Sequence, residues 1–97
     1  MYDIRGTWEY TMAVSDGNTF DSGTITFSGS PEEGTYLEIN IYEVDYDGEY
    51  QVDGISLTLS GDENWQGTIE DASNMNGTWE HLDEDFSGTW TAVRQEP

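Results

Sequence analysis

An acidic stretch in the middle of the chain has the residue spacing closest to a chemical site. Glu43, Asp45 and Asp47 alternate with other residues and lead to Gly48, as in the first half of a calcium loop. A loop of the EF-hand type counted from Glu43 needs a bidentate glutamate at its twelfth position, where the chain has Gly54. The flanking residues also have strand rather than helix patterns. We therefore interpret Asp45 to Gly48 as an acidic hairpin turn and expect no metal site and no cofactor.

Candidates for catalysis are few. His81 is the only histidine, and alternation places it on the same strand face as Gly77 and Trp79. A general base needs a positioned partner, and the sequence does not identify one. The chain has no cysteine, and the serines around Gly29 lack the strand-turn-helix context of a nucleophile elbow. We predict no catalytic residue and no enzymatic activity.

The aromatic residues are the best candidates for binding. The chain has four Trp, six Tyr and three Phe, and large rings can build a core at roughly 150–250 Å² each. Two interpretations remain open: the rings fill the interior, or they line a cavity that admits one small apolar or aromatic ligand. The candidate ligand-binding residues are Tyr10, Tyr36, Trp65, Trp79, Phe86 and Trp90.

A repeated Gly-Thr dipeptide indicates the elements that must position these rings. It occurs six times, each time before a bulky residue and after a turn-like cluster; the glycines are Gly6, Gly23, Gly34, Gly67, Gly77 and Gly88. Alternating residues bounded by turns are typical of short antiparallel strands. The predicted strands span 4–14, 19–28, 34–44, 49–52, 55–60 and 64–70, followed by two more that contain Gly77 and Gly88.

The glycines also predict how the interior is packed. In the last third of the chain each lies two residues before a bulky side chain, so both face the same side of the sheet. A glycine there leaves space that a tryptophan from a neighbouring strand can fill. A simpler interpretation is that Gly-Thr only ends a turn and starts a strand. Strand 34–44 is less regular, because Leu37, Ile39 and Ile41 share one face while Tyr36, Glu38, Asn40 and Tyr42 share the other.

Eight short strands joined by hairpins predict an all-β, antiparallel up-and-down meander that closes into a small barrel, with residues 1–97 as a single domain. At two positions the chain resembles the lipocalin and avidin group of barrels. Gly6-Thr7-Trp8 matches their Gly-x-Trp at the start of the first strand, and Arg94 matches their basic residue at the end of the last. The resemblance implies that Trp8 and Arg94 pack together and close one end.

Short bacterial domains of the lipocalin-like type resemble the chain most in its C-terminal part. The matching stretches are Asn76-Gly77-Thr78-Trp79 and Ser87-Gly88-Thr89-Trp90. The ligand contacts of those families have no match here, so their ligand chemistry is not transferred.

Charge restricts the partners. There are 21 acidic residues against two arginines and no lysine, for a net charge of -19. A protein built for high salt is one interpretation, because salt screens self-repulsion; a calcium-binding surface and an ordinary acidic surface domain are the others. Two arginines cannot neutralise a phosphate backbone, which excludes nucleic acid as a partner.

No membrane span or signal peptide is evident in the sequence. The abrupt lead from the first residue into a strand suggests a chain trimmed from a longer precursor. Contact with a membrane is expected only if that precursor carries a lipid anchor, and an extracytoplasmic or cell-surface location is favoured. The compartment and oligomeric state are not determined by the sequence.

Two functions are compatible with this pattern. The first is a non-catalytic, lipocalin-like barrel from a salt-loving organism that binds a small apolar or aromatic ligand. The second is an interaction or structural module of a surface protein or lipoprotein, with a filled barrel and no ligand. An internal cavity of several hundred cubic ångströms, the usual scale of a ligand pocket, would distinguish them.

Overall fold

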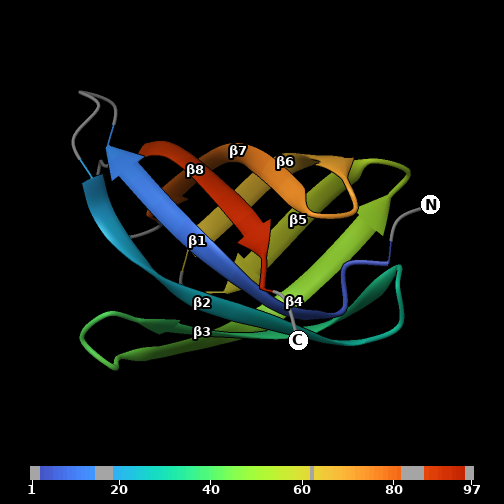
Figure 1. The fold of residues 1–97 in the computed structure, drawn as a ribbon, viewed down its shortest axis with the longest axis horizontal. Helices are drawn as coiled ribbons and strands as arrows, with labels where there is room; N and C mark the ends of the chain where they lie inside the picture. The colour runs from blue at the N-terminus through green and yellow to red at the C-terminus, as the bar shows by residue number, and fades with distance from the viewer. Residues whose placement is uncertain (1–2, 15–18, 62, 82–86, 96–97) are drawn as a thin grey trace.

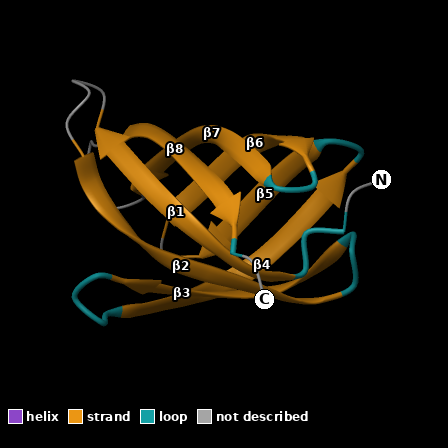
Figure 2. Cartoon of the chain, viewed as in Figure 1, coloured by secondary structure: helices purple, strands orange, loops and turns teal. Residues whose placement is uncertain are grey.

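A computed structural model describes residues 3–14, 19–61, 63–81 and 87–95, and in these ranges all regular structure is β-strand (Figures 1 and 2). Each strand pairs antiparallel with the next, and the last pairs with the first, which closes the predicted meander into a barrel. Within the described ranges no helix is long and apolar enough to cross a bilayer. The strands are β1 (Gly6–Val14), β2 (Thr19–Gly29), β3 (Glu33–Asn40), β4 (Asp45–Asp53), β5 (Ser56–Gly61), β6 (Glu63–Asp71), β7 (Asn74–His81) and β8 (Ser87–Arg94).

Alternation along β1 follows the sequence prediction. Trp8, Tyr10 and Met12 are buried in the barrel, whereas Glu9 and Thr11 between them are exposed. A period of two is the pattern of a strand with one face on the core. The same alternation continues in β5 and β8, so most of the barrel wall has one apolar inner face and one polar outer face.

The predicted packing of tryptophan over glycine is confirmed at Gly67. A Cβ atom added there would overlap Cζ2 of Trp90, because the indole extends from β8 across β7 to β6. Trp90 Nε1 donates to the carbonyl oxygens of Gln66 at 3.2 Å and Thr78 at 3.1 Å. Gly67 and Gly77 lie inside their strands, opposite each other in the ladder. These two glycines therefore make room for the packed interior and do not merely mark the start of a strand.

One end of the barrel is closed by the predicted contact between Trp8 and Arg94. The two residues are directly paired between β1 and β8, and the guanidinium carbon lies 4.6 Å from the indole centroid. Arg94 also donates from Nε to the carbonyl of Ala72 at 2.8 Å and from a terminal nitrogen to that of Arg5 at 2.8 Å. The guanidinium thus joins the last strand to the N-terminal segment and to the β6–β7 turn.

An ion pair also lies at the closed end. Asp3 and Arg5 contact each other at 2.7 Å, and hydrogen bonds from the Arg5 side chain and backbone lower the pKa of the Asp3 carboxyl to about 2. Both side chains are exposed, so the pair contributes little to stability.

The predicted turn from Asp45 to Gly48 is wrong, because these residues belong to β4. The turn lies earlier, between the end of β3 at Asn40 and the start of β4. The Oδ1 atom of Asn40 accepts hydrogen bonds from the backbone N–H groups of Tyr42 at 2.9 Å and Val44 at 3.0 Å. The side chain of Asn40 thus stabilises a turn that contains no glycine. β3 consequently ends before the predicted residue 44, and β4 is longer than the predicted 49–52.

Gly48 is needed for packing inside the sheet. An added Cβ would overlap the backbone oxygen of Ser60 and would lie 2.8 Å from Cε2 of Tyr36. The Asp53-Gly54 turn, in contrast, is where the sequence predicted it. Gly54 has a φ of 64° at the first position of a two-residue connection between β4 and β5, as a type II′ hairpin requires.

Candidate functional site

Three of the predicted ligand-binding residues meet inside the barrel. The ring of Trp65 lies edge-on to Tyr10 at 5.5 Å and tilted against Trp90 at 5.2 Å between centroids. All three side chains are at most 2% exposed. They come from β6, β1 and β8 and pack across the interior rather than along one wall. We call Tyr10, Trp65 and Trp90 the aromatic cluster.

Of the other predicted residues, Trp79 lies beside Trp65 as its direct cross-strand partner in the β6–β7 ladder. Trp79 is buried, and its Nε1 donates to the carbonyl oxygens of Ala13 and Thr89, each at 3.1 Å. Tyr36 is buried beside Gly48 on the other side of the barrel. Phe86 lies outside the described residues. The structure therefore gathers Tyr10 and Trp90 around Trp65, with Trp79 next to it on β7, and places Tyr36 beside Gly48.

Trp65 differs from the other tryptophans in its indole nitrogen. Trp8, Trp79 and Trp90 each donate to a backbone carbonyl, whereas the buried Nε1 of Trp65 has no hydrogen-bond partner among the described residues. A buried donor without a partner costs about 1–3 kcal/mol. This N–H group is the one buried side-chain donor of the described interior that a ligand acceptor could satisfy.

A carboxylate lies inside the barrel as well. Glu38 is 1% exposed, and its Oε2 accepts a hydrogen bond of 2.8 Å from the hydroxyl of Tyr10. It faces inward because β3 turns its more polar face to the core. Tyr36, Glu38 and Asn40 are buried, whereas the aliphatic Leu37 and Ile39 are exposed. Burying a carboxylate is costly unless hydrogen bonds compensate.

Glu38 was absent from the predicted site residues, although a signal for it existed. Tyr36 was predicted to face the interior, and the period of two then places Glu38 and Asn40 on the same inner face. The aliphatic residues Leu37, Ile39 and Ile41 lie on the opposite face of the strand. Because aliphatic residues usually face the core, they concealed the inward orientation of Glu38. The hydroxyl of Tyr10 thereby links the aromatic cluster to a buried carboxyl group.

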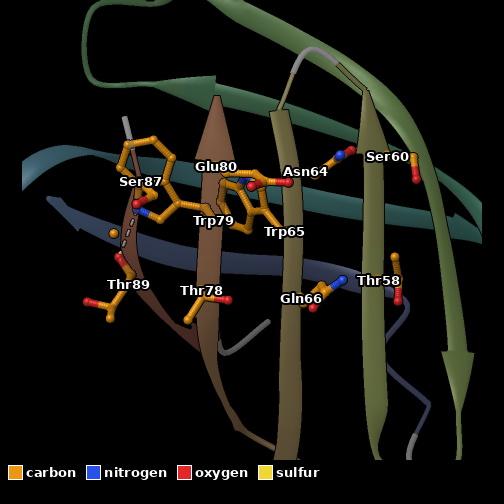
Figure 3. A pocket seen from close by; sticks show the side chains of 11 residues that line it. Thr58, Ser60, Asn64, Trp65, Gln66, Thr78, Trp79, Glu80, Ser87 and Thr89 are labelled. Carbon is orange, nitrogen blue, oxygen red and sulfur yellow. Dashed lines mark hydrogen bonds between the residues drawn. The ribbon is translucent and has the colours of Figure 1, made fainter. Parts of the chain in front are cut away.

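A hollow of about 620 Å³ lies over β5 to β8 and is drawn in Figure 3. Strand alternation explains its mixed lining. Gln66 and Thr78 are exposed on the outer face, whereas Trp65 and Trp79 are buried side chains of the same strands. The remaining lining residues are Thr58, Ser60, Asn64, Glu80, Ser87, Gly88 and Thr89. The lining of the hollow is therefore mostly polar and includes two predicted binding residues, Trp65 and Trp79.

The acidic stretch of β4 has no calcium-loop geometry. Asp45, Asp47 and Glu49 are exposed along the extended strand, so successive carboxylates lie about 6–7 Å apart on its outer face. Within the described residues, no group of three His, Cys, Asp or Glu side chains is arranged to hold a metal ion. The side chain of His81 lies outside the described part of the chain.

These features define a closed eight-stranded antiparallel barrel with an aromatic interior. No family model matches the sequence, and no curated protein matches it. Solved structures do match the fold. One is a redesigned β-barrel, with a TM-score of 0.74 and 20% identity over 96% of this chain and 92% of that one.

Two further structural matches are also barrels. A de novo designed fluorescence-activating β-barrel has a TM-score of 0.67 and 20% identity, over 98% of this chain and 100% of its own. A structure named EF1p2_mFAP2b, bound to DFHBI, has a TM-score of 0.68 and 18% identity, over 95% of this chain and 94% of its own. At such low identity the likeness is one of fold.

Proposed function

We propose that this protein is a non-catalytic, lipocalin-like barrel that binds a small aromatic or apolar ligand carrying one hydrogen-bond acceptor. The ligand contacts Trp65 in the half of the barrel away from Trp8 and Arg94, and its acceptor takes the N–H group of Trp65. The unpartnered, buried Nε1 of Trp65 is the observation that carries this proposal. Mostly apolar sites with a few polar groups are typical of small-ligand pockets.

Three further observations support this place for the ligand. The hollow over β5 to β8 is lined in part by Trp65 and Trp79, which places a surface hollow next to the aromatic cluster. Tyr10 and Glu38 supply a polar pair on the far side of the Trp65 ring. One barrel with the same fold is bound to DFHBI, and another is described as fluorescence-activating. Because the rings are in contact, we expect Trp65 to move when a ligand enters.

Fluorescence measured in 2 M NaCl tests the proposal. DFHBI and a panel of fatty acids, retinoids and aromatic metabolites are titrated into the protein while tryptophan emission and, for DFHBI, the emission of the compound are recorded. We expect at least one compound to saturate with a shift in tryptophan emission. Trp65→Phe keeps an aromatic ring but removes the donor, and should weaken binding about 5- to 10-fold for a net hydrogen bond of about 1 kcal/mol.

The matched control is Trp8→Phe, whose indole N–H already bonds the backbone carbonyl of Ile4 at the closed end, away from the proposed site. It should affect stability but leave the acceptor preference of the ligand unchanged. If no compound alters the emission, or if Trp65→Phe and Trp8→Phe weaken binding equally, the proposed site is wrong.

The acidic composition supports a second element of the proposal, which is adaptation to high salt. With -19 net charges and no lysine, repulsion across the surface is relieved as the Debye length falls from ~10 Å at 0.1 M to ~3 Å at 1 M salt. A second candidate function, an interaction module, is favoured by the apolar outer face of β3.

A further inference from the structure

Exposed apolar side chains gather on one segment of this barrel. Of seven exposed large hydrophobic residues in the described ranges, five lie between positions 37 and 44, and Ile55 and Val93 are the other two. The five form the β3 apolar patch, which consists of Leu37, Ile39, Ile41, Tyr42 and Val44. It covers the outer face of β3 and the connection to β4 at the lower left of Figure 1. Contiguous exposed apolar surface marks interaction sites more often than single residues do.

The orientation that exposes this patch is held firmly. A slip of one residue would bury Leu37 and Ile39, but it would also remove Glu38 from Tyr10 and Asn40 from the turn. Asn40 caps that turn through Tyr42 and Val44 and donates to Asp21 at 3.3 Å. The patch is therefore presented on a pre-organised hairpin, which lowers the entropic cost of binding.

The partner must contact side chains rather than backbone. β3 is hydrogen-bonded to β2 on one side and to β4 on the other, so its backbone cannot accept an added strand. A hollow of about 610 Å³, whose lining includes Leu37, Asp47 and Glu49, extends the patch along β3. An apolar row beside a hollow suits the apolar face of a helix or extended segment.

Carboxylates border the patch along one side. The β3–β4 register places Asp47 opposite Leu37 and Asp45 opposite Ile39, and Glu43 lies in the connecting turn. On the other side, the register with β2 places Thr26 and Thr24 next to the same two aliphatic residues. An apolar row flanked by one acidic edge is complementary to an amphipathic segment with Lys or Arg on one flank.

A second copy of this chain cannot supply that charge. Its only two cationic side chains besides histidine are Arg5 and Arg94; Arg5 pairs with Asp3, and Arg94 stacks on Trp8, both at the closed end. A copy seated on the patch would bring carboxylates to carboxylates. An anionic bilayer is disfavoured for the same reason.

We propose that the β3 apolar patch docks a cationic amphipathic segment of a different protein. Apolar side chains of that segment cover Leu37, Ile39 and Ile41, and its Lys or Arg side chains pair with Asp45 and Asp47. This docking is independent of ligand binding inside the barrel, because the patch lies on the outer face of the wall.

The probe is a synthetic Leu/Lys peptide with its leucines on one helical face, titrated into the full chain by calorimetry at 0.15 M and 1 M NaCl. Leu37→Thr/Ile39→Thr keeps the charge and β-propensity and should weaken binding at least 10-fold. Its matched control, Ile55→Thr/Val93→Thr, removes the two exposed apolar residues elsewhere and should bind as the wild type does. A sequence-scrambled peptide of the same composition should bind at least 10-fold more weakly.

A second pair of variants tests the charge. Asp45→Asn/Asp47→Asn should weaken binding and reduce its salt dependence, whereas Glu32→Gln/Glu33→Gln, with exposed carboxylates outside the patch, should not.

Equal binding by all variants, or by the scrambled peptide, would mean attraction to net charge alone and would overturn the proposal. So would a dimer, by sedimentation in 0.15 M NaCl, that is lost in Leu37→Thr/Ile39→Thr. Patch-dependent binding to phosphatidylcholine/phosphatidylglycerol vesicles without peptide binding would also overturn it, in favour of a membrane surface.

Discussion

The hydrogen bond between Tyr10 and Glu38 offers a sharp test of the inverted orientation of β3. Tyr10→Phe removes one hydroxyl and leaves the ring contact with Trp65 intact. The lost bond is 2.8 Å long and ends on a side chain that is 1% exposed. Leaving a buried acceptor without its partner costs about 1–3 kcal/mol, so we expect the free energy of unfolding to fall by that amount. In a 97-residue domain each kcal/mol lowers Tm by about 4–8 °C.

A double-mutant cycle separates this bond from general effects on the core. In a Glu38→Leu background the carboxylate is absent, so Tyr10→Phe should cost less than about 0.5 kcal/mol. The coupling energy between the two positions should then be at least about 0.5 kcal/mol. Urea unfolding of the four proteins, followed by far-UV circular dichroism in 2 M NaCl, supplies the free energies.

Two outcomes would refute the reasoning. Additive effects of Tyr10→Phe and Glu38→Leu would show that the hydroxyl and the carboxylate do not meet. A Glu38→Lys variant as stable as the wild type would place position 38 in solvent, since a lysine facing this interior would be an unpaired buried charge. Glu9→Lys, on the exposed face of β1, is the matched control and should change stability little.

Three other predictions concern salt, packing and titration. The urea midpoint should rise between 0.05 M and 2 M NaCl by more than for a neutral domain, because screening relieves the repulsion among -19 net charges; equal midpoints would contradict this. Gly67→Ala should cost about 1–3 kcal/mol by overpacking against Trp90, with a smaller cost in a Trp90→Phe background. The pKa of Asp3, lowered from 3.8 to about 2 by Arg5, means that any stabilisation from this pair is complete above pH 3.8 and is lost as pH falls through about 2. Carboxyl NMR titration should show a midpoint near 2 that Arg5→Gln raises towards 3.8.

Much of the fold could be predicted because its signals are local. The alternation in β1, the Asp53-Gly54 turn and the spacing of the C-terminal glycines each depend on residues close in sequence. The contact between Trp8 and Arg94 is a long-range feature, and it was accessible only through resemblance to other barrels. Together these signals determine an eight-stranded meander with one closed end.

The site depended on tertiary structure. Whether Gly48 serves a turn or the packing of Tyr36 was decided by the ring that lies against it. The inward face of β3 carries Glu38, which is bonded to Tyr10, and Asn40, which caps the turn, while Leu37 and Ile39 lie outside. Sequence periodicity identifies two faces of a strand but does not say which one is inside when both carry apolar and polar residues. The unpartnered nitrogen of Trp65 and the exposed patch on β3 follow from that choice and from the closure of the barrel, which only the assembled structure contains.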